Sequence, residues 1–251
     1  MSKVLPAELP EVSFSEDEEV RHLHLGTPWI QGSMRRDAPF DIELEYVQRM
    51  MAWLLFVPAE TVPERHAMQL GLGAGALTKF CYKKLQMRCT AIELNEQVVL
   101  ACRQWFRLPA PNQRLRIVLA DAGQEIARAQ HVGTVDALQV DLYDHEAAAP
   151  VIDSPAFYAD CRRLLTEDGV MSVNLFGRQA SFEQSVGRIA EAFEASALWV
   201  FRPTREGNTV VLALRQPVSL DRGKLLERAR TIESKWGLPA IKWLKTLQPW
   251  A

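Results

Sequence analysis

The sequence lacks several features that would place it in a specialised class of protein. It has four cysteines among 251 residues, and no two of them form a C-x-x-C pair. This scattered spacing argues against a disulfide framework and against a cysteine-ligated metal site. We therefore expect reduced, mostly buried thiols, no bound metal, and a cytoplasmic location.

No hydrophobic run is long enough to cross a bilayer. The best candidate, MMAWLLFV over residues 50–57, is far shorter than the roughly 20 residues that a transmembrane helix needs. The first 20 residues are acidic and have no apolar core, so we do not expect a signal peptide. The net charge of -2 provides no overall basic field, and we expect neither nucleic acid nor a membrane as a partner.

Strand-like and helix-like segments alternate through the middle of the chain. Two late strands, residues 198–204 and 208–214, are separated only by the turn REG and must pair antiparallel. We predict an α/β protein with a doubly wound, mostly parallel sheet that ends in an antiparallel hairpin. The earlier strands are expected at residues 66–73, 88–94, 114–121, 135–142 and 170–176.

Three parts are expected along the chain. Residues 1–40 combine an acidic, flexible arm to about residue 18 with a β-hairpin formed by VRHLHL, the turn GTP and WIQGSMR. Residues 41–217 form the sheet domain, whose first helix is expected over residues 40–57. Residues 218–251 form a tail of one or two amphipathic helices.

A glycine-rich loop follows the first strand of the expected sheet. In QLGLGAG, Gly71, Gly73 and Gly75 let the backbone turn sharply before a helix whose free N–H groups favour a bound ligand. The next strand ends with Glu93, at the spacing where such folds place a carboxylate that accepts the ribose hydroxyls. The alternatives are a plain tight turn and a surface acid that caps the following helix, a role open to Asn95 as well.

The third strand ends with LAD. Asp121 can accept a hydrogen bond from an adenine amino group, and Ala122 offers its backbone N–H. Asp121 can equally cap the next helix, and the two roles do not exclude each other. Because the strand ends share one edge of an open sheet, the loop, Glu93 and Asp121 together predict a nucleoside site.

The fourth strand ends in an acidic stretch, QVDLYDHE. Asp141 and Asp144 lie where two carboxylates would attract and orient an ammonium group, and one of them could accept the proton of an attacking amine. Tyr143, between them, either closes the pocket or packs under the loop. The alternative is an acidic loop that solvates the end of the strand.

At this point the sequence resembles the spermidine synthase (polyamine aminopropyltransferase) family, over about residues 20–214. The matching parts are LGLGAGALTKF, AIELNEQVV, VLADAGQEIA, and the long segment from VDALQVDLYDHE to VMSVNLFG. The resemblance implies the fold of the class I S-adenosylmethionine-dependent transferases. It also implies a small N-terminal β-domain that forms a homodimer.

The resemblance further implies roles for individual residues. Asp141 would be the catalytic aspartate and Asp144 the diamine-binding one, with Glu93 on the ribose and Asp121 beside the adenine. Three further residues would face the substrates, and they are Gln31, Tyr46 and Tyr143. The co-substrate would be S-adenosylmethionine or its decarboxylated form, without a metal, and the acceptor a small amine.

Three departures from the family pattern concern recognition of the donor tail and the diamine. The family's aspartate between the glycines is Ala74 here, and the proline after its second aspartate is His145. Its Y-H-E reads Tyr46, Val47, Gln48. From the resemblance, aminopropyl transfer to an amine is the first hypothesis. The alternatives are an S-adenosylmethionine-dependent methyltransferase, which Ala74 favours, and a non-catalytic nucleoside-binding homologue.

Overall fold

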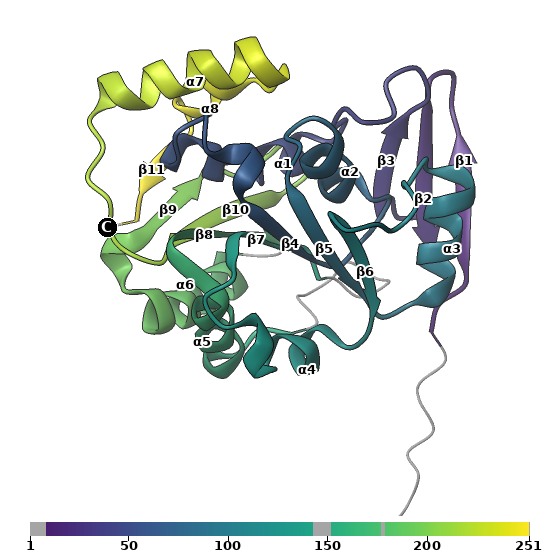
Figure 1. Ribbon diagram of the computed structural model, residues 1–251, viewed down its shortest axis with the longest axis horizontal. Coiled ribbons are helices and arrows are strands. Elements are labelled where there is room, and N and C mark those ends of the chain that lie inside the picture. Colours follow the sequence, from purple (N-terminus) through teal and green to yellow (C-terminus); the bar gives the residue numbers. More distant parts are fainter. Residues whose placement is uncertain (1–8, 143–151, 177–178, 251) are drawn as a thin grey trace, which may run out of the picture.

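The computed structural model describes residues 9–142, 152–176 and 179–250. Its centre is an eight-stranded sheet between two layers of helices (Figure 1). The order across the sheet is β11 (Leu247–Pro249), β9 (Leu198–Phe201), β10 (Asn208–Leu214), β8 (Leu165–Phe176), β7 (Val135–Val140), β4 (His66–Leu70), β5 (Arg88–Glu93) and β6 (Leu115–Leu119).

The pairing of the strands confirms the predicted fold class. Strands β8, β7, β4, β5 and β6 run parallel, and β10 and β9 add antiparallel at one side. The central strands β4 and β7 are buried along nearly their whole length, and their buried polar side chains Gln69 and Gln139 are hydrogen-bonded to each other. The segment from residue 218, which was expected to be helical, also supplies β11, which pairs antiparallel with β9.

Helices cover both faces of the sheet (Figure 1). One face packs against α4 (Ala122–Ile126), α5 (Pro155–Leu164) and α6 (Gln179–Phe193). The other packs against α1 (Glu45–Arg49), α2 (Ala76–Lys83), α7 (Arg222–Trp236) and α8 (Ala240–Trp243). Short 3-10 turns complete the structure: η1 (Ala52–Phe56), η2 (Val62–Glu64), η3 (Ala129–His131) and η4 (Ala195–Ala197). Among the described residues, no helix has the length and apolar character needed to span a membrane.

The segment before β4 differs from its prediction. A single helix was expected over residues 40–57, but the structure has the short helix α1 and then the 3-10 turn η1. Every residue from Met50 to Val57 is buried. The segment is therefore a buried part of the core with apolar residues on every side. Because every position is apolar, the spacing of its apolar residues could not show whether it forms a regular helix.

A small antiparallel sheet precedes the main domain. It contains β1 (Val12–Glu16), β2 (Val20–Leu25) and β3 (Gly32–Arg35), so the predicted hairpin is present and has a third strand. Strand β1 lies within the expected flexible arm. Its Phe14 packs on Trp105 of α3 (Glu96–Trp105), with ring centroids 5.0 Å apart, and this tertiary contact orders the segment.

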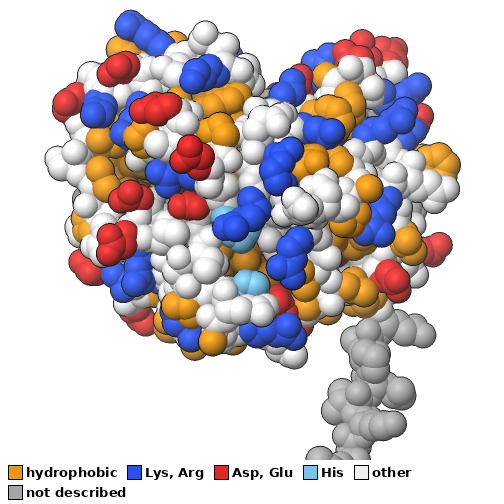
Figure 2. Space-filling model, viewed as in Figure 1, with side chains coloured by type: hydrophobic (Ala, Val, Ile, Leu, Met, Phe, Trp, Pro, Cys, Tyr) orange, Lys and Arg blue, Asp and Glu red, His pale blue; other side chains and the backbone are white. Residues whose placement is uncertain are grey.

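The small sheet docks directly on the glycine loop. A Cβ at Gly32 would lie 2.6 Å from the backbone nitrogen of Ala74 and 2.8 Å from its Cβ. Behind this contact, Leu23 and Met34 pack with Leu72 in a separate hydrophobic cluster. From the side shown in Figure 2, a notch separates the lobe formed by this sheet from the lobe formed by α7, with acidic and basic side chains interspersed.

This contact predicts a large effect of a single methyl group. Gly32→Ala is expected to lower the free energy of unfolding by about 1–3 kcal/mol, because the added Cβ overlaps backbone atoms that cannot move aside. Chemical denaturation measures the change. Gly187→Ala is the matched control: a Cβ there meets nothing within 4 Å inside α6, so it should be neutral or stabilising. Equal stability of the two variants would contradict the tight contact.

Candidate active site

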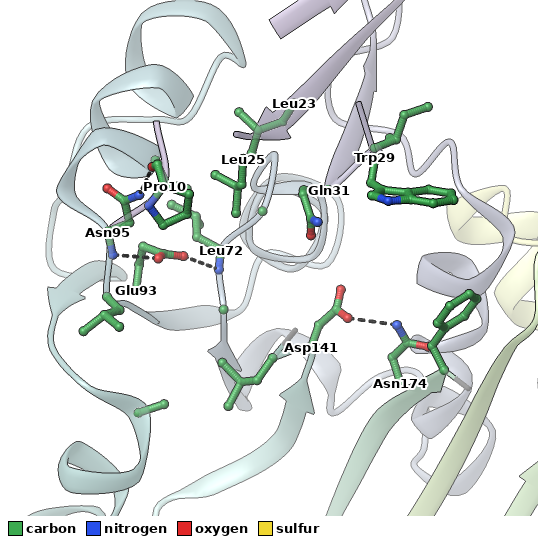
Figure 3. Close-up of a pocket in the computed structure, with 18 of the residues that line it drawn as sticks. Pro10, Leu23, Leu25, Trp29, Gln31, Leu72, Glu93, Asn95, Asp141 and Asn174 are labelled. Atoms are coloured by element: carbon green, nitrogen blue, oxygen red, sulfur yellow. Dashed lines mark hydrogen bonds between the residues drawn. The ribbon is translucent and has the colours of Figure 1, made fainter. Parts of the chain in front are cut away.

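A cavity of about 710 Å³ lies at the carboxyl ends of the parallel strands. The main sheet forms its floor, and the small sheet closes it from above with Leu23, Leu25, Trp29 and Gln31 (Figure 3). Open α/β sheets bind ligands at this edge, because loops from neighbouring strands converge there. The location makes this cavity the candidate active site.

The glycine loop forms one wall of the cavity. Gly71 has φ +88°, and a Cβ there would meet the carbonyl oxygen of Asp141 at 2.4 Å. Gly73 has φ +49°, and a Cβ there would lie 3.0 Å from the carbonyl oxygen of Gln31. Only glycine combines these backbone angles with such close approaches. Gly71 and Gly73 line the cavity, whereas Gly75 begins α2 behind the loop, near Leu108.

Glu93 holds the glycine loop against the next strand (Figure 3). One carboxylate oxygen accepts a hydrogen bond from the Leu72 backbone nitrogen at 2.9 Å, and the other accepts from that of Asn95 at 2.8 Å. Burial raises the pKa of Glu93, and these backbone hydrogen bonds partly offset the rise. Capping of α3 falls to Asn95, whose Oδ1 accepts from the Gln97 nitrogen, so the carboxylate of Glu93 remains at the cavity wall.

Asp121 and Ala122 line the same side of the cavity. Asp121 Oδ1 accepts a hydrogen bond from the Gln124 backbone nitrogen at 2.8 Å and thereby caps α4. The capping role of Asp121 is therefore confirmed, and the residue also lines the cavity, where its role toward an adenine stays a prediction. Capping fixes the orientation of the carboxylate, which favours binding of a ligand in one pose.

Asp141 follows β7 and carries the most elaborate hydrogen bonding in the cavity. Its Oδ2 accepts from the Tyr46 hydroxyl at 3.3 Å, and its Oδ1 accepts from Asn174 Nδ2 at 3.0 Å. The Asn174 side chain is itself held, because its Oδ1 accepts from Asn208 Nδ2 at 3.1 Å. Burial raises the pKa of Asp141, against the opposing effect of the hydrogen bonds from Asn174 and Tyr46.

Sequence reasoning missed Asn174, Asn208 and Glu206, which all line the cavity. A signal for Asn174 was available, because it is a polar residue near the end of the apolar run VMSVNLF. Strand β8 pairs parallel with β7 in a register that places Val173 beside Val140, so Asn174 comes next to Asp141. No local signal marks Asn208 or Glu206.

The other predicted site residues are divided between the cavity and the undescribed segment. Gln31 and Tyr46 line the cavity. Asp144, Tyr143 and His145 lie outside the described residues. The residues noted as departures from the family do not replace lost polar contacts: Val47 is buried in the core, and Gln48 Nε2 donates to the Ile42 carbonyl.

The charge of the cavity has one sign. Among the described lining residues there are carboxylates but no lysine, arginine or histidine. In such a partly closed space, a cationic ligand is stabilised and a ligand carboxylate would have no basic partner. No described group of three or more His, Cys, Asp or Glu residues is arranged to hold a metal. The lining carboxylates belong to Glu43, Glu45, Glu93, Asp121, Asp141 and Glu206.

The hydrogen bond from Tyr46 predicts a change in the pH dependence of activity. Tyr46→Phe removes a contact that lowers the pKa of Asp141, so this pKa should rise further. If Asp141 acts as a base, the acidic limb of the kcat–pH profile moves to higher pH, and activity at a pH below that limb falls. Tyr82→Phe, on the far side of α2 and bonded to Asn112, is the control. An unchanged profile would contradict the coupling of Tyr46 to Asp141.

The chain was compared with known proteins. The model of the spermine/spermidine synthase domain matches residues 48–221, which is more than half of the chain and includes Glu93, Asp121 and Asp141. The chain belongs to the spermine/spermidine synthase family. A polyamine aminopropyltransferase of Neisseria meningitidis serogroup A is 32% identical over 241 residues, which cover 95% of this chain and 89% of that protein.

Solved structures place the fold in the same group. A probable spermidine synthase of Corynebacterium glutamicum superposes with a TM-score of 0.72 at 18% identity, covering 94% of this chain and 90% of its own. Human methyltransferase-like protein 13, in complex with SAH, superposes with a TM-score of 0.69 at 23% identity, covering 78% and 93%. At these identities the likeness concerns the fold, and it confirms the methyltransferase-like sheet that the sequence predicted.

Proposed function

We propose that this chain is an aminopropyltransferase, which moves the aminopropyl group of decarboxylated S-adenosylmethionine to an amine acceptor. The observation that carries the proposal is the row of carboxylates along the strand ends, with no basic residue among the described lining of the cavity. Glu93 and Asp121 suit the nucleoside, and Asp141 suits an amine. The family membership supports the same reaction.

Gln31 supports a bound ligand independently of the carboxylates. Its Nε2 is buried in the cavity wall and donates to no described residue, and in Figure 3 the side chain points into the space above Asp141. A buried donor without a partner costs roughly 1–3 kcal/mol. A ligand oxygen or nitrogen that accepts a hydrogen bond from Gln31 would remove that cost, which favours a bound ligand in the cavity.

The transfer needs positioning and one proton acceptor. The acceptor nitrogen attacks the propyl carbon bonded to the sulfonium, the N–C bond forms, and the C–S bond breaks with its electron pair going to sulfur. The products are an alkylated amine and methylthioadenosine. Asp141 would orient the nitrogen and take its proton, and the hydrogen bonds from Tyr46 and Asn174 hold the carboxylate in place for this step.

The absence of basic side chains from the described lining favours the decarboxylated donor. The carboxylate of S-adenosylmethionine would enter a space lined by acids, and this repulsion disfavours its binding. Ala74 provides no carboxylate to anchor the donor amine, and its backbone lies in close contact with Gly32 of the small sheet. Recognition of the donor would then rest on the summed charge of the cavity rather than on one partner.

Two measurements test the function. Calorimetry with methylthioadenosine and with decarboxylated S-adenosylmethionine should show binding, and a mass spectrum of the product should show an aminopropyl increment on the amine. A methyl increment, with S-adenosylmethionine as donor, would replace the proposal by the methyltransferase. Binding without turnover of any amine would support a non-catalytic homologue. Absence of binding would contradict all three hypotheses: the aminopropyltransferase, the methyltransferase and the non-catalytic homologue.

Three further statements belong to this proposal. Asp144 would hold the cationic acceptor, as the sequence resemblance implies, although it lies outside the described residues. A cytoplasmic location is supported by the four cysteines, which are free and buried. A homodimer is supported by the resemblance of the N-terminal β-sheet to the family's oligomerising domain. Size-exclusion chromatography with light scattering measures the oligomeric state.

A further inference from the structure

The cavity extends beyond the nucleoside side of the sheet. Across the strand order, Asp121 comes after β6, Glu93 ends β5, Gly71 follows β4, and Asp141 follows β7. The remaining floor continues over β8 and β10, where Phe176, Asn174, Asn208 and Glu206 line it. A donor placed on Glu93 with its sulfonium near Asp141 leaves this further end open, which makes it the place for the rest of the acceptor.

Of the carboxylates in the cavity, Glu206 has the least local compensation. Glu45 forms an ion pair with Arg49 at 2.5 Å, and Glu43 lies within electrostatic reach of Arg35. Glu93 and Asp121 accept hydrogen bonds from backbone N–H groups, and Asp141 accepts them from the side chains of Tyr46 and Asn174. Within the described part of the chain, no hydrogen bond or ion pair involves the Glu206 carboxylate.

The turn that carries Glu206 is fixed in place. Between β9 and β10, the Thr204 nitrogen donates to the Asn208 carbonyl at 2.8 Å, and the Gly207 nitrogen donates to the Thr204 carbonyl at 3.1 Å. Gly207 adopts φ +99°, and a Cβ there would lie 3.2 Å from the Phe176 ring. The Asn208 side chain donates to Asn174, so the turn is tied to the residue that holds Asp141. Glu206 itself is exposed on this anchored turn, where it lines the cavity.

We propose that Glu206 is a specificity-determining residue, which holds the second ammonium group of a diamine or polyamine acceptor while the reacting nitrogen lies at Asp141. The inference rests on the proposed aminopropyl transfer, in which the resemblance assigns Asp144 to the acceptor, and it adds a further carboxylate for the acceptor's far end. Strands β7 and β10 are separated by β8 alone, so the two sites are about 10 Å apart at the level of the sheet.

The space between the two carboxylates suits an alkyl chain. Phe176 lies on the floor, and Trp29 and Ile30, which are 64% and 48% exposed, line the opening from the small sheet. An acceptor laid across this region would cover both exposed side chains, and its methylene groups would replace water there. A monoamine could reach Asp141 but would leave Glu206 without a partner.

Kinetics with a diamine and a monoamine of equal chain length test the proposal. With decarboxylated S-adenosylmethionine as donor, the wild type should have a lower KM for 1,4-diaminobutane than for n-butylamine. Glu206→Gln should raise the KM for the diamine by about fivefold, the effect of a partly exposed ion pair, and leave the KM for n-butylamine unchanged. Glu167→Gln is the matched control, since it removes an exposed carboxylate at the start of β8 that does not line the cavity.

The outcomes separate this proposal from the function on which it rests. Glu206 does not bind the second ammonium group if Glu206→Gln changes both KM values equally or changes neither. The same conclusion follows if the wild type does not prefer the diamine. If neither amine is alkylated, calorimetry of both amines in the presence of methylthioadenosine gives the same comparison without turnover. Failure to bind methylthioadenosine at all would overturn the aminopropyl transfer itself.

Discussion

Replacing Asp141 with asparagine is expected to lower kcat by about 10²-fold to 10⁴-fold, the usual contribution of a positioned general base. The amide keeps the shape of the side chain and can still contact Tyr46 and Asn174, but it cannot take a proton from the amine. The affinity for methylthioadenosine should stay unchanged, because in the proposed function the nucleoside binds at Glu93 and Asp121. Steady-state kinetics and calorimetry measure the two quantities.

Asp168→Asn is the control for this prediction. Asp168 is exposed near the start of β8, at the edge of the sheet opposite the cavity, and the substitution changes the net charge by the same amount. Its kcat should equal that of the wild type. A kcat for Asp141→Asn within a few-fold of the wild type would exclude Asp141 as the base and leave positioning alone to account for the rate.

The same substitution has a consequence for stability. Burial raises the pKa of Asp141 in the folded chain above its unfolded value of about 3.9, so the folded state binds this proton more tightly. The free energy of unfolding therefore falls as the pH rises from the unfolded pKa through the folded one, and it stays lowered at higher pH. Asp141→Asn removes this loss and should be at least as stable as the wild type at pH 7.

Glu93→Gln is expected to weaken methylthioadenosine binding by about 10²-fold, close to 3 kcal/mol, because two hydrogen bonds from ribose hydroxyls to a carboxylate are lost or weakened. The substitution also disturbs the Leu72 and Asn95 contacts, so near-UV circular dichroism must show that the loop remains folded. Calorimetry measures the affinity. The reaction rate at saturating donor should fall far less than with Asp141→Asn.

Glu96→Gln provides the comparison for this second prediction. Glu96 is exposed in the first turn of α3, three residues further along, and is not among the residues that line the cavity. It should bind methylthioadenosine as the wild type does. An unchanged affinity for a correctly folded Glu93→Gln would show that the carboxylate holds the glycine loop and does not contact the nucleoside.

The residues at the ends of the parallel strands were more predictable from the sequence than those near β10. Glu93, Asp121 and Asp141 could be found because each lies at or just past the carboxyl end of a parallel strand, and these ends meet at one edge. Asn174 could have been found by the same reasoning. Glu206 and Asn208 could not, because their strand runs antiparallel and brings its beginning, rather than its end, to the cavity.

The sequence by itself determined the class of the fold and the nucleoside side of the site, because periodicity and turn residues are local and repeat along the chain. Tertiary structure alone decided three things: that β1 and β11 join their sheets, that Gly32 packs against the glycine loop at Ala74, and that Glu206 lines the same cavity as Asp141. Each of these depends on contacts between residues far apart in the chain. Such contacts form only when the whole core packs, and no short stretch of sequence carries their signature.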